Sequence, residues 1–284
     1  MKLYSQVVFP PLKSPFSLQD RIVFLGSCFA DSIGEKMAAA GFDVLVNPFG
    51  TLYNPASLLQ AVRRLDSCTP FGPADCVPMG AGAGRICSFE HHTSFARPAA
   101  EEFLSNANAK LQQAREFWGK ANRLVLTLGT SFVWRCDGRV VANCLKRPAG
   151  EFTREMLSVE QSSECLSAIA SAHPEKQILI TVSPIRHLGD GAHTNAISKA
   201  RLLLSAEALT EANGPAQYFP AFEIMMDELR DYRFYADDLV HPSPAAVNYI
   251  WERFLATAVS PSDLDQIARN EKEHKQQSHR PNLL

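Results

Sequence analysis

Five short apolar stretches recur along the chain, and segments with helical spacing separate them. The stretches are residues 22–25 (IVFL), 42–46 (FDVLV), 124–128 (LVLTL), 177–182 (QILITV) and 217–226. Runs of this length are typical of strands that are buried on both faces of a sheet. Strands that alternate with helices predict an α/β fold, a three-layer α/β/α sandwich around a five-stranded parallel sheet.

The intervening segments carry the signals of helices. After the first strand, Phe29, Ile33 and Met37 recur at helical spacing. Asn54 and Pro55 favour a helix start, because asparagine caps helix N-termini and proline suits the first helical position. The predicted helices cover residues 29–40, 55–65, 98–121, 153–173 and 244–258, and another long helix ends near residue 212.

One segment breaks this alternation. Residues 66–97 are dense in glycine and proline and show no helical period, which predicts an inserted excursion or a lid. Residues 1–20 read as an extended arm, and the residues beyond 260 are charged and poor in apolar side chains. We therefore expect one domain over residues 1–260, followed by a charged C-terminal tail over residues 261–284.

The composition limits the classes of partner that we expect for this protein. The 284 residues include 28 Lys and Arg against 30 Asp and Glu, a net charge of −2, which gives no electrostatic reason to expect nucleic acid. No apolar run approaches the roughly 20 residues of a membrane span. Prolines interrupt the N-terminal segment, which does not resemble a signal peptide. We predict a cytoplasmic protein without a nucleic-acid or membrane partner, and the pattern leaves the oligomeric state open.

The cysteines follow no ligand or disulfide pattern. They number seven, none belongs to a CxxC pair, and they stand at positions 28, 68, 76, 87, 136, 144 and 165. An odd, scattered set predicts free thiols in a reducing compartment rather than a zinc site or a disulfide framework. The sequence therefore predicts no metal and no cofactor.

The end of the first strand carries candidate nucleophiles. Gly26 allows a sharp turn, and Ser27 and Cys28 place a hydroxyl and a thiol where the next helix begins. The free N–H groups and the dipole at a helix N-terminus favour negative charge, whether on a thiolate or on an oxyanion. This is where an α/β enzyme would hold a nucleophile.

A pair of residues far along the chain fits the role of the base. Asp238 and His241 are three residues apart in the sequence Asp-Leu-Val-His, so one turn can present both side chains. Asp238 would then hold the Nδ1 proton of His241 while Nε2 faces the nucleophile. Acyl transfer needs this set, together with donors for the oxyanion.

At these residues the sequence resembles a known family. GSCFA at residues 26–30 matches the name-giving motif of the GSCFA family, and further segments follow in order over most of residues 21–255. They are NPFGTLYNP, TLGTSFVW, VANCLKRP, TVSPIRH and YFPAFEIMMDELRDYRFYADDLVHPS. The family is similar to the SGNH or GDSL-type hydrolases, which implies a three-layer α/β/α fold and action on acyl esters. Asp238 and His241 match the Asp-x-x-His block of that superfamily.

The first block departs from the superfamily pattern. Gly26-Ser27-Cys28 stands where Gly-Asp-Ser is expected, so direct register makes Cys28 the nucleophile and a shift of one residue makes it Ser27. Direct register needs no change of the backbone, and a helix N-terminus lowers the pKa of a thiol, which favours Cys28. The other interpretation of Cys28 is a small packing residue.

The third block departs as well. In the superfamily this block is Gly-x-Asn-Asp, whose asparagine donates to the oxyanion, but here Gly129-Thr130 follows the strand without an Asn-Asp pair. Several other polar or glycine positions could bind the oxyanion or the substrate, and each has an equally good interpretation as a residue that shapes a loop. The candidates are Gly50, Gly129, Thr130, Asn47, Asn143 and His187.

These features together predict an SGNH-like enzyme that acts on ester bonds. It would be a hydrolase or an acyltransferase that forms a covalent acyl-enzyme on Cys28 or Ser27. The substrate would be a small-molecule or glycan acyl ester, or a thioester, and the acyl group and acceptor stay open. The alternative is a non-catalytic ligand-binding protein that keeps the fold, which the missing Asn-Asp pair favours. A redox-sensing thiol protein is a third interpretation, resting on Cys28 alone.

Overall fold

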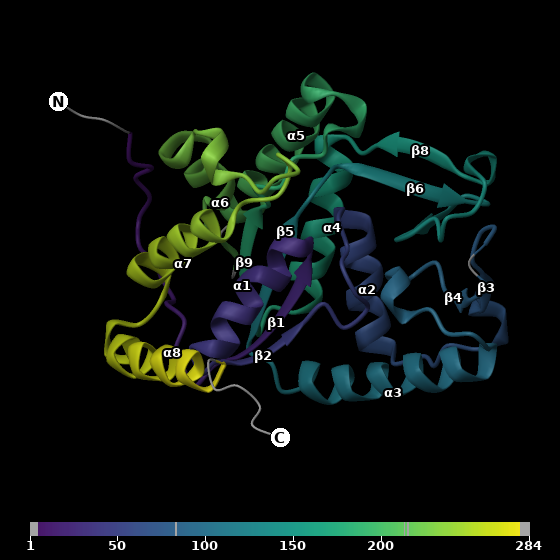
Figure 1. Cartoon of the computed structure of the whole chain (residues 1–284), viewed down its shortest axis with the longest axis horizontal. Coiled ribbons are helices and arrows are strands. Elements are labelled where there is room, and N and C mark those ends of the chain that lie inside the picture. The colour runs from purple at the N-terminus through teal and green to yellow at the C-terminus, as the bar shows by residue number, and fades with distance from the viewer. Residues whose placement is uncertain (1–4, 83, 213, 215, 279–284) are drawn as a thin grey trace.

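A computed structural model describes residues 5–82, 84–212, 214 and 216–278 (Figure 1). At its centre is a five-stranded sheet in the order β10-β9-β5-β1-β2, with every neighbouring pair parallel. The strands are β1 (Arg21–Gly26), β2 (Asp43–Val46), β5 (Arg123–Leu128), β9 (Gln177–Val182) and β10 (Ala216–Tyr218). Numbered along the chain, this order is 2-1-3-4-5, as in flavodoxin-like doubly wound sheets. The predicted fold class is confirmed.

Alternate side chains of the strands enter two separate cores, one on each face of the sheet. Val23 and Leu25 pack with the helices on one face, and Ile22 and Phe24 pack with those on the other. The first face is covered by α2 (Pro55–Ser67), α3 (Ala100–Trp118), α4 (Val159–Ala172) and α5 (Ala192–Glu211). The second is covered by α1 (Cys28–Ala39), α7 (Pro244–Ala258) and α8 (Leu264–Ser278) (Figure 1). The result is the expected α/β/α sandwich.

Two small antiparallel sheets lie outside the central one. β3 (Val77–Pro78) pairs with β4 (Ile86–Cys87) inside the segment at residues 66–97, which also sends Phe71 into the core. The other sheet has the order β7-β6-β8 and consists of β6 (Phe132–Cys136), β7 (Arg139–Val141) and β8 (Thr153–Met156).

The structure corrects the boundaries of two predicted elements. The helix expected over residues 153–173 begins only at α4, where Ser158 caps it, and residues 153–156 form β8 instead. The strand expected over residues 217–226 ends at Tyr218. Pro220, which lacks an N–H for the ladder, is followed by the short helix α6 (Ala221–Glu223) and a π-helical turn (Ile224–Leu229).

The two ends of the described chain pack against the second helical layer. Phe16, in the segment expected to form an arm, is 1% exposed and its N–H donates to Ala258 O. The segment expected to be a charged tail forms α8, which buries Ile267 and accepts a 2.7 Å hydrogen bond from Trp251 Nε1 on Glu271 Oε1. That part of the tail is therefore a docked helix, and residues 279–284 lie outside the described residues.

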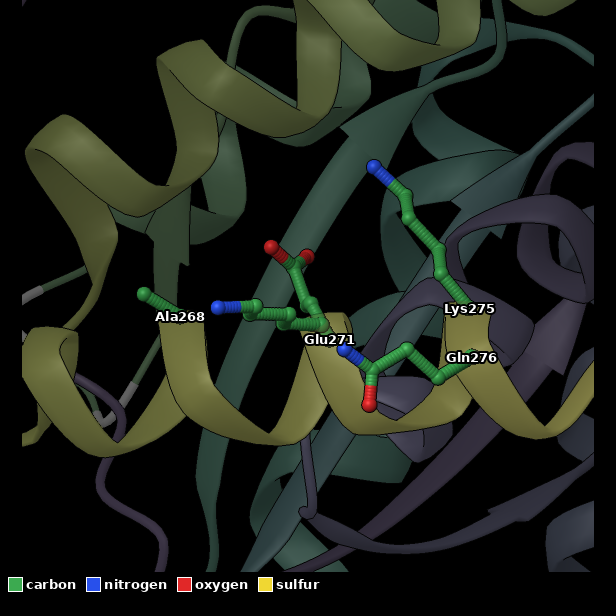
Figure 2. Close-up of a pocket in the computed structure, with 5 residues that line it drawn as sticks. Ala268, Glu271, Lys275 and Gln276 are labelled. Carbon is green, nitrogen blue, oxygen red and sulfur yellow. The ribbon is translucent and has the colours of Figure 1, made fainter.

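A hollow of about 500 Å³ runs along α8, as Figure 2 shows. Its lining residues come from this one helix and are Ala268, Glu271, Lys272, Lys275 and Gln276. The same helix contacts Ala40 through Asn270, at the far end of α1 from Cys28. Twelve helical residues span about 18 Å, so this hollow belongs to the scaffold rather than to the turn at Cys28. None of the described helices has the length and apolar composition that a membrane crossing requires.

Candidate active site

The turn after β1 depends on the glycine at position 26. Gly26 has φ +154°, and a Cβ there would lie 2.2 Å from Thr127 Oγ1 and 2.3 Å from Thr127 O. A side chain would therefore collide with β5, the neighbouring strand. Glycine lets β1 run close beside β5 and then turn directly into α1.

Ser27 faces the interior of the protein. Its side chain is fully buried and caps α1, with Oγ accepting a hydrogen bond from Phe29 N at 3.3 Å. The same oxygen lies 3.4 Å from Thr127 Oγ1. These contacts give Ser27 the role of an N-cap and direct its hydroxyl away from the base described below.

Cys28 is the first residue of α1, and its thiol meets the predicted histidine. Cys28 Sγ lies 3.4 Å from Nε2 of His241, although the two residues are 213 positions apart. Burial raises the pKa of the Cys28 thiol, and the backbone N–H of Cys28 itself acts in the opposite direction. Asp31 raises this pKa further and Lys199 lowers it. The expectation that the helix N-terminus would lower the thiol pKa is wrong in net direction, because desolvation is the larger effect.

The turn at residues 238–241 holds the imidazole in place. Asp238 Oδ2 lies 2.6 Å from His241 Nδ1, while Oδ1 accepts the backbone N–H groups of Val240 and His241 at 2.8 and 2.9 Å. These hydrogen bonds lower the pKa of Asp238 to about 2, so the carboxylate is ionised at neutral pH. A carboxylate at Nδ1 keeps the proton on that nitrogen and leaves the Nε2 lone pair directed at Cys28.

Three further side chains surround the thiol, and sequence reasoning gave two of them no role. Lys199 on α5 is fully buried, and burial lowers its pKa to about 7. Burial of Tyr53 raises the pKa of its phenol, and Cys28 contributes to that rise. His187, which was predicted to lie at this edge, packs edge-on to Tyr53 with ring centroids 5.8 Å apart. Its Nε2 is buried without a hydrogen-bond partner among the described residues, and burial lowers its pKa to about 4.

Gly129 and Thr130, the oxyanion candidates that follow β5, have structural hydrogen-bond partners. The N–H groups of Gly129 and Thr130 both donate to Tyr53 O, at 2.9 and 2.8 Å. Thr130 Oγ1 lies 3.0 Å from Ser198 Oγ and accepts from Phe132 N. The backbone N–H groups of these two residues join β5 to the β2–α2 loop, and the Thr130 hydroxyl contacts Ser198 on α5.

The other predicted oxyanion residues also take part in structural hydrogen bonds. Gly50 N donates to Asn47 O at 2.7 Å, and Asn47 bridges the turn at Gly26 to Asp31 through Oδ1 and Nδ2. Asn143 Oδ1 accepts from Leu145 N, which shapes the turn after β7. The expectation that Gly50 and Asn47 offer free donors is wrong, because their polar groups hold β1, α1 and the β2–α2 loop together.

A second hollow adjoins the turn that carries the histidine. It measures about 190 Å³ and is lined by Arg186, Met225, Met226, Arg230, Asp231, Tyr232 and Tyr235. Arg186 connects this hollow to the turn, because its N–H donates to Val240 O and its Nη1 to Leu239 O. Within the described ranges, no group of three or more His, Cys, Asp or Glu side chains is placed to hold a metal ion.

Comparisons with known proteins define the family. The GSCFA family matches residues 21–254. A solved structure described as a platelet activating factor from Streptococcus pneumonia shares 14% identity, with a TM-score of 0.41 over 83% of this chain and 84% of that chain. The psychrotrophic esterase EstA from Pseudoalteromonas sp. also shares 14% identity, with a TM-score of 0.39 over 83% of this chain and 94% of that chain. A search of the curated proteins found no match. Because the family match spans most of the sequence and includes both Cys28 and His241, the chain belongs to the GSCFA family.

Proposed function

We propose that the protein is an SGNH-like esterase or acyltransferase that forms a thioester on Cys28. The observation that carries this proposal is the continuous series from Cys28 Sγ to His241 Nε2 at 3.4 Å and from His241 Nδ1 to Asp238 Oδ2 at 2.6 Å. A nucleophile, a base and a group that orients the base are the parts that acyl transfer needs. Ser27 is the weaker nucleophile candidate, because its hydroxyl caps α1 and is fully buried.

In the proposed resting state, the Cys28 thiol donates its proton in a hydrogen bond to Nε2 of His241. Burial raises the pKa of Cys28, so the proton leaves Sγ for His241 Nε2 as the sulfur attacks the carbonyl carbon of the ester. Collapse of the tetrahedral intermediate breaks the bond to the alkoxide, which takes the proton back from His241. A water molecule or an acceptor hydroxyl then attacks the thioester, giving its proton to Nε2, and the thiolate leaves and is reprotonated.

The backbone at the start of α1 supplies the first oxyanion donor in this proposal. The backbone N–H of Cys28 acts on the pKa of the sulfur and is the candidate donor, since the N–H of Phe29 also donates to Ser27 Oγ. An oxygen that develops negative charge next to Sγ would lie at the positive end of the α1 dipole. The hollow between Arg186 and Tyr235 adjoins the base turn and would receive the leaving group or the acceptor, including a glycan or a thioester.

Intact-mass spectrometry after exposure to p-nitrophenyl acetate tests the proposal. We expect an acetyl adduct on the wild type that is absent from Cys28→Ala, much slower to form in His241→Ala and retained in Ser27→Ala. Cys136→Ala is the matched control, because that thiol is also partly exposed but lies at the end of β6. An adduct lost only in Ser27→Ala would instead establish the shifted register.

The second candidate function is a ligand-binding protein without turnover. The observation that favours it is the use of the Gly129 and Thr130 N–H groups by Tyr53 O, which leaves the third block without a donor. A folded wild type that forms no adduct with any activated ester, and that still binds such esters, would support this function against the first.

A further inference from the structure

A lysine is buried next to the candidate site. Lys199 is 2% exposed, and its Nζ donates to Gly129 O at 2.6 Å and to Ser183 O at 2.8 Å. Gly129 and Ser183 directly follow β5 and β9. The ammonium therefore lies at the carboxyl ends of two central strands, at the edge of the sheet where Cys28 also lies.

Among the residues that the structure describes, no carboxylate forms a salt bridge with Lys199. Burial disfavours the ammonium, and the group whose charge counteracts that effect is Cys28. Removing an ammonium from water without a charged partner is costly. Both buried lysines lie over an aromatic ring, Lys176 over Trp118 at 4.5 Å and Lys199 over Phe222 at 5.9 Å, but Lys176 also lies 3.7 Å from Glu175 Oε1. Among the described residues, negative charge on Cys28 would give Lys199 the charged partner that Lys176 already has.

The electrostatic interaction between Lys199 and Cys28 also acts on the pKa of the thiol. Burial and the Asp31 carboxylate both raise the pKa of Cys28, and Lys199 acts against them. The other titratable groups that act at this position are Tyr53 from the β2–α2 loop and His187 after β9, each through interaction with Cys28 or Lys199. When its amine is protonated, Lys199 places a positive charge inside the protein, where screening by salt is weak.

We propose that Lys199 is a positioning residue whose buried ammonium stabilises the Cys28 thiolate while the thiol proton moves to His241. The proton passes from Sγ to Nε2, the electron pair stays on sulfur, and Lys199 gains the counter-charge that the resting site lacks. The two carbonyl hydrogen bonds fix the ammonium at the strand ends, so its position does not depend on substrate. The role in catalysis rests on the proposed function, whereas the effect on the thiol does not.

The pH dependence of Cys28 alkylation tests this inference without any ester. Iodoacetamide reacts with the thiolate, and mass spectrometry of the peptide that contains Cys28 separates its rate from those of the other six cysteines. In Lys199→Met, which keeps the length of the side chain and removes its charge, we expect the midpoint of the rate profile to rise by about one pH unit. The rate at pH 7 should fall about tenfold.

Lys176→Met is the matched control. Lys176 is also buried and also donates to two carbonyls, those of Trp118 and Ala121, but it lies at the opposite edge of the sheet. Its alkylation profile should overlay the wild type. An unchanged midpoint in folded Lys199→Met, or equal shifts in both variants, would overturn the inference.

A second measurement covers the case in which Lys199→Met does not fold. Because the interaction is reciprocal, the NMR titration midpoint of Lys199 should fall in Cys28→Ala, where no thiolate forms. An unchanged Lys199 midpoint in that variant would overturn the inference. A shifted alkylation profile combined with no acyl adduct on the wild type would leave the role of Lys199 intact and reject the proposed enzyme.

Discussion

All strands of the central sheet begin at one side, here called the amino edge, and end at the opposite side, the carboxyl edge. The two edges carry similar side chains in different arrangements. At the amino edge, Lys176 is paired with Glu175, and His173 Nε2 and Nδ1 contact Asp66 and Glu175 at 3.1 and 3.2 Å. At the carboxyl edge, Lys199 forms no salt bridge with a carboxylate of the described residues, and His241 has a carboxylate at Nδ1 and a thiol at Nε2.

The two histidines differ in what their second ring nitrogen faces, and this distinguishes the cluster that supports the fold from the cluster at the candidate site. Both ring nitrogens of His173 face acidic groups, so the ring serves to join α4 to the end of α2. The second nitrogen of His241 faces a thiol that can give up a proton. At the carboxyl edge, the proton transfer that we propose would create the pairing that the amino edge already has at rest.

Removal of each histidine should give the largest contrast between the edges. We expect His241→Gln to slow acetylation of Cys28 by about 10²–10⁴-fold, because general-base catalysis contributes that much. His173→Gln should lower stability and leave acetylation unchanged. Stopped-flow release of p-nitrophenolate measures both rates, and an equal loss of rate in the two variants would remove the distinction.

Replacing the carboxylate beside each histidine should also affect acetylation at the carboxyl edge alone, with a smaller loss of rate. Asp238→Asn removes the negative charge that holds the proton on Nδ1 of His241, and should slow acetylation by about 10²-fold, the low end of the range for such groups because Asp238 is half exposed. Asp66→Asn keeps the site and weakens contacts to His173 and Trp118. If Asp238→Asn acetylates at the wild-type rate, Asp238 does not orient the base.

His187 should make the free energy of unfolding depend on pH in the acidic range. Its folded pKa of about 4 lies below the roughly 6.5 of an unfolded chain, so only the unfolded state takes up the proton between these values. The free energy of unfolding should therefore fall as pH drops from 6.5 to 4, by about 1.4 kcal/mol per pH unit relative to His187→Gln. Urea unfolding at several pH values measures this slope, and parallel curves for the two proteins would contradict it.

The smallest effect should come from the helix cap next to the nucleophile. Ser27→Ala removes the acceptor for Phe29 N and should cost about 1 kcal/mol of stability with acetylation of Cys28 retained. Ser158→Ala, which removes the cap of α4, should cost a similar amount. Loss of acetylation in Ser27→Ala alone would show that the serine does more than cap α1.

The sequence predicted the central fold well because its strands are continuous apolar runs. It failed where an element owes its structure to pairing or to a few contacts. Three of the four β8 side chains are exposed, so its pairing with β6 leaves no apolar signal. In α8, a mostly polar sequence docks through Ile267 and two hydrogen bonds, too few apolar positions to predict burial.

Prediction of the candidate site from the sequence was limited in the same way. Cys28, Asp238 and His241 were predicted because each belongs to a short motif, whereas the oxyanion candidates were not separable from loop-shaping residues until their hydrogen bonds were known. Lys199 was missed because a lysine on a helix normally faces solvent. A usable signal did exist, since Lys199 falls in register with the buried stripe of Leu202, Ala206 and Leu209 on α5.

The long separation between Cys28 and His241 has a consequence during synthesis of the chain. The thiol emerges from the ribosome early, on the first strand-turn-helix unit, while its base lies 213 residues later and is followed by α7. A partly made or truncated chain therefore carries the thiol without its base. The acylation proposed for Cys28 needs His241 and therefore nearly the whole domain, so base-assisted acylation of this cysteine would report on completed folding.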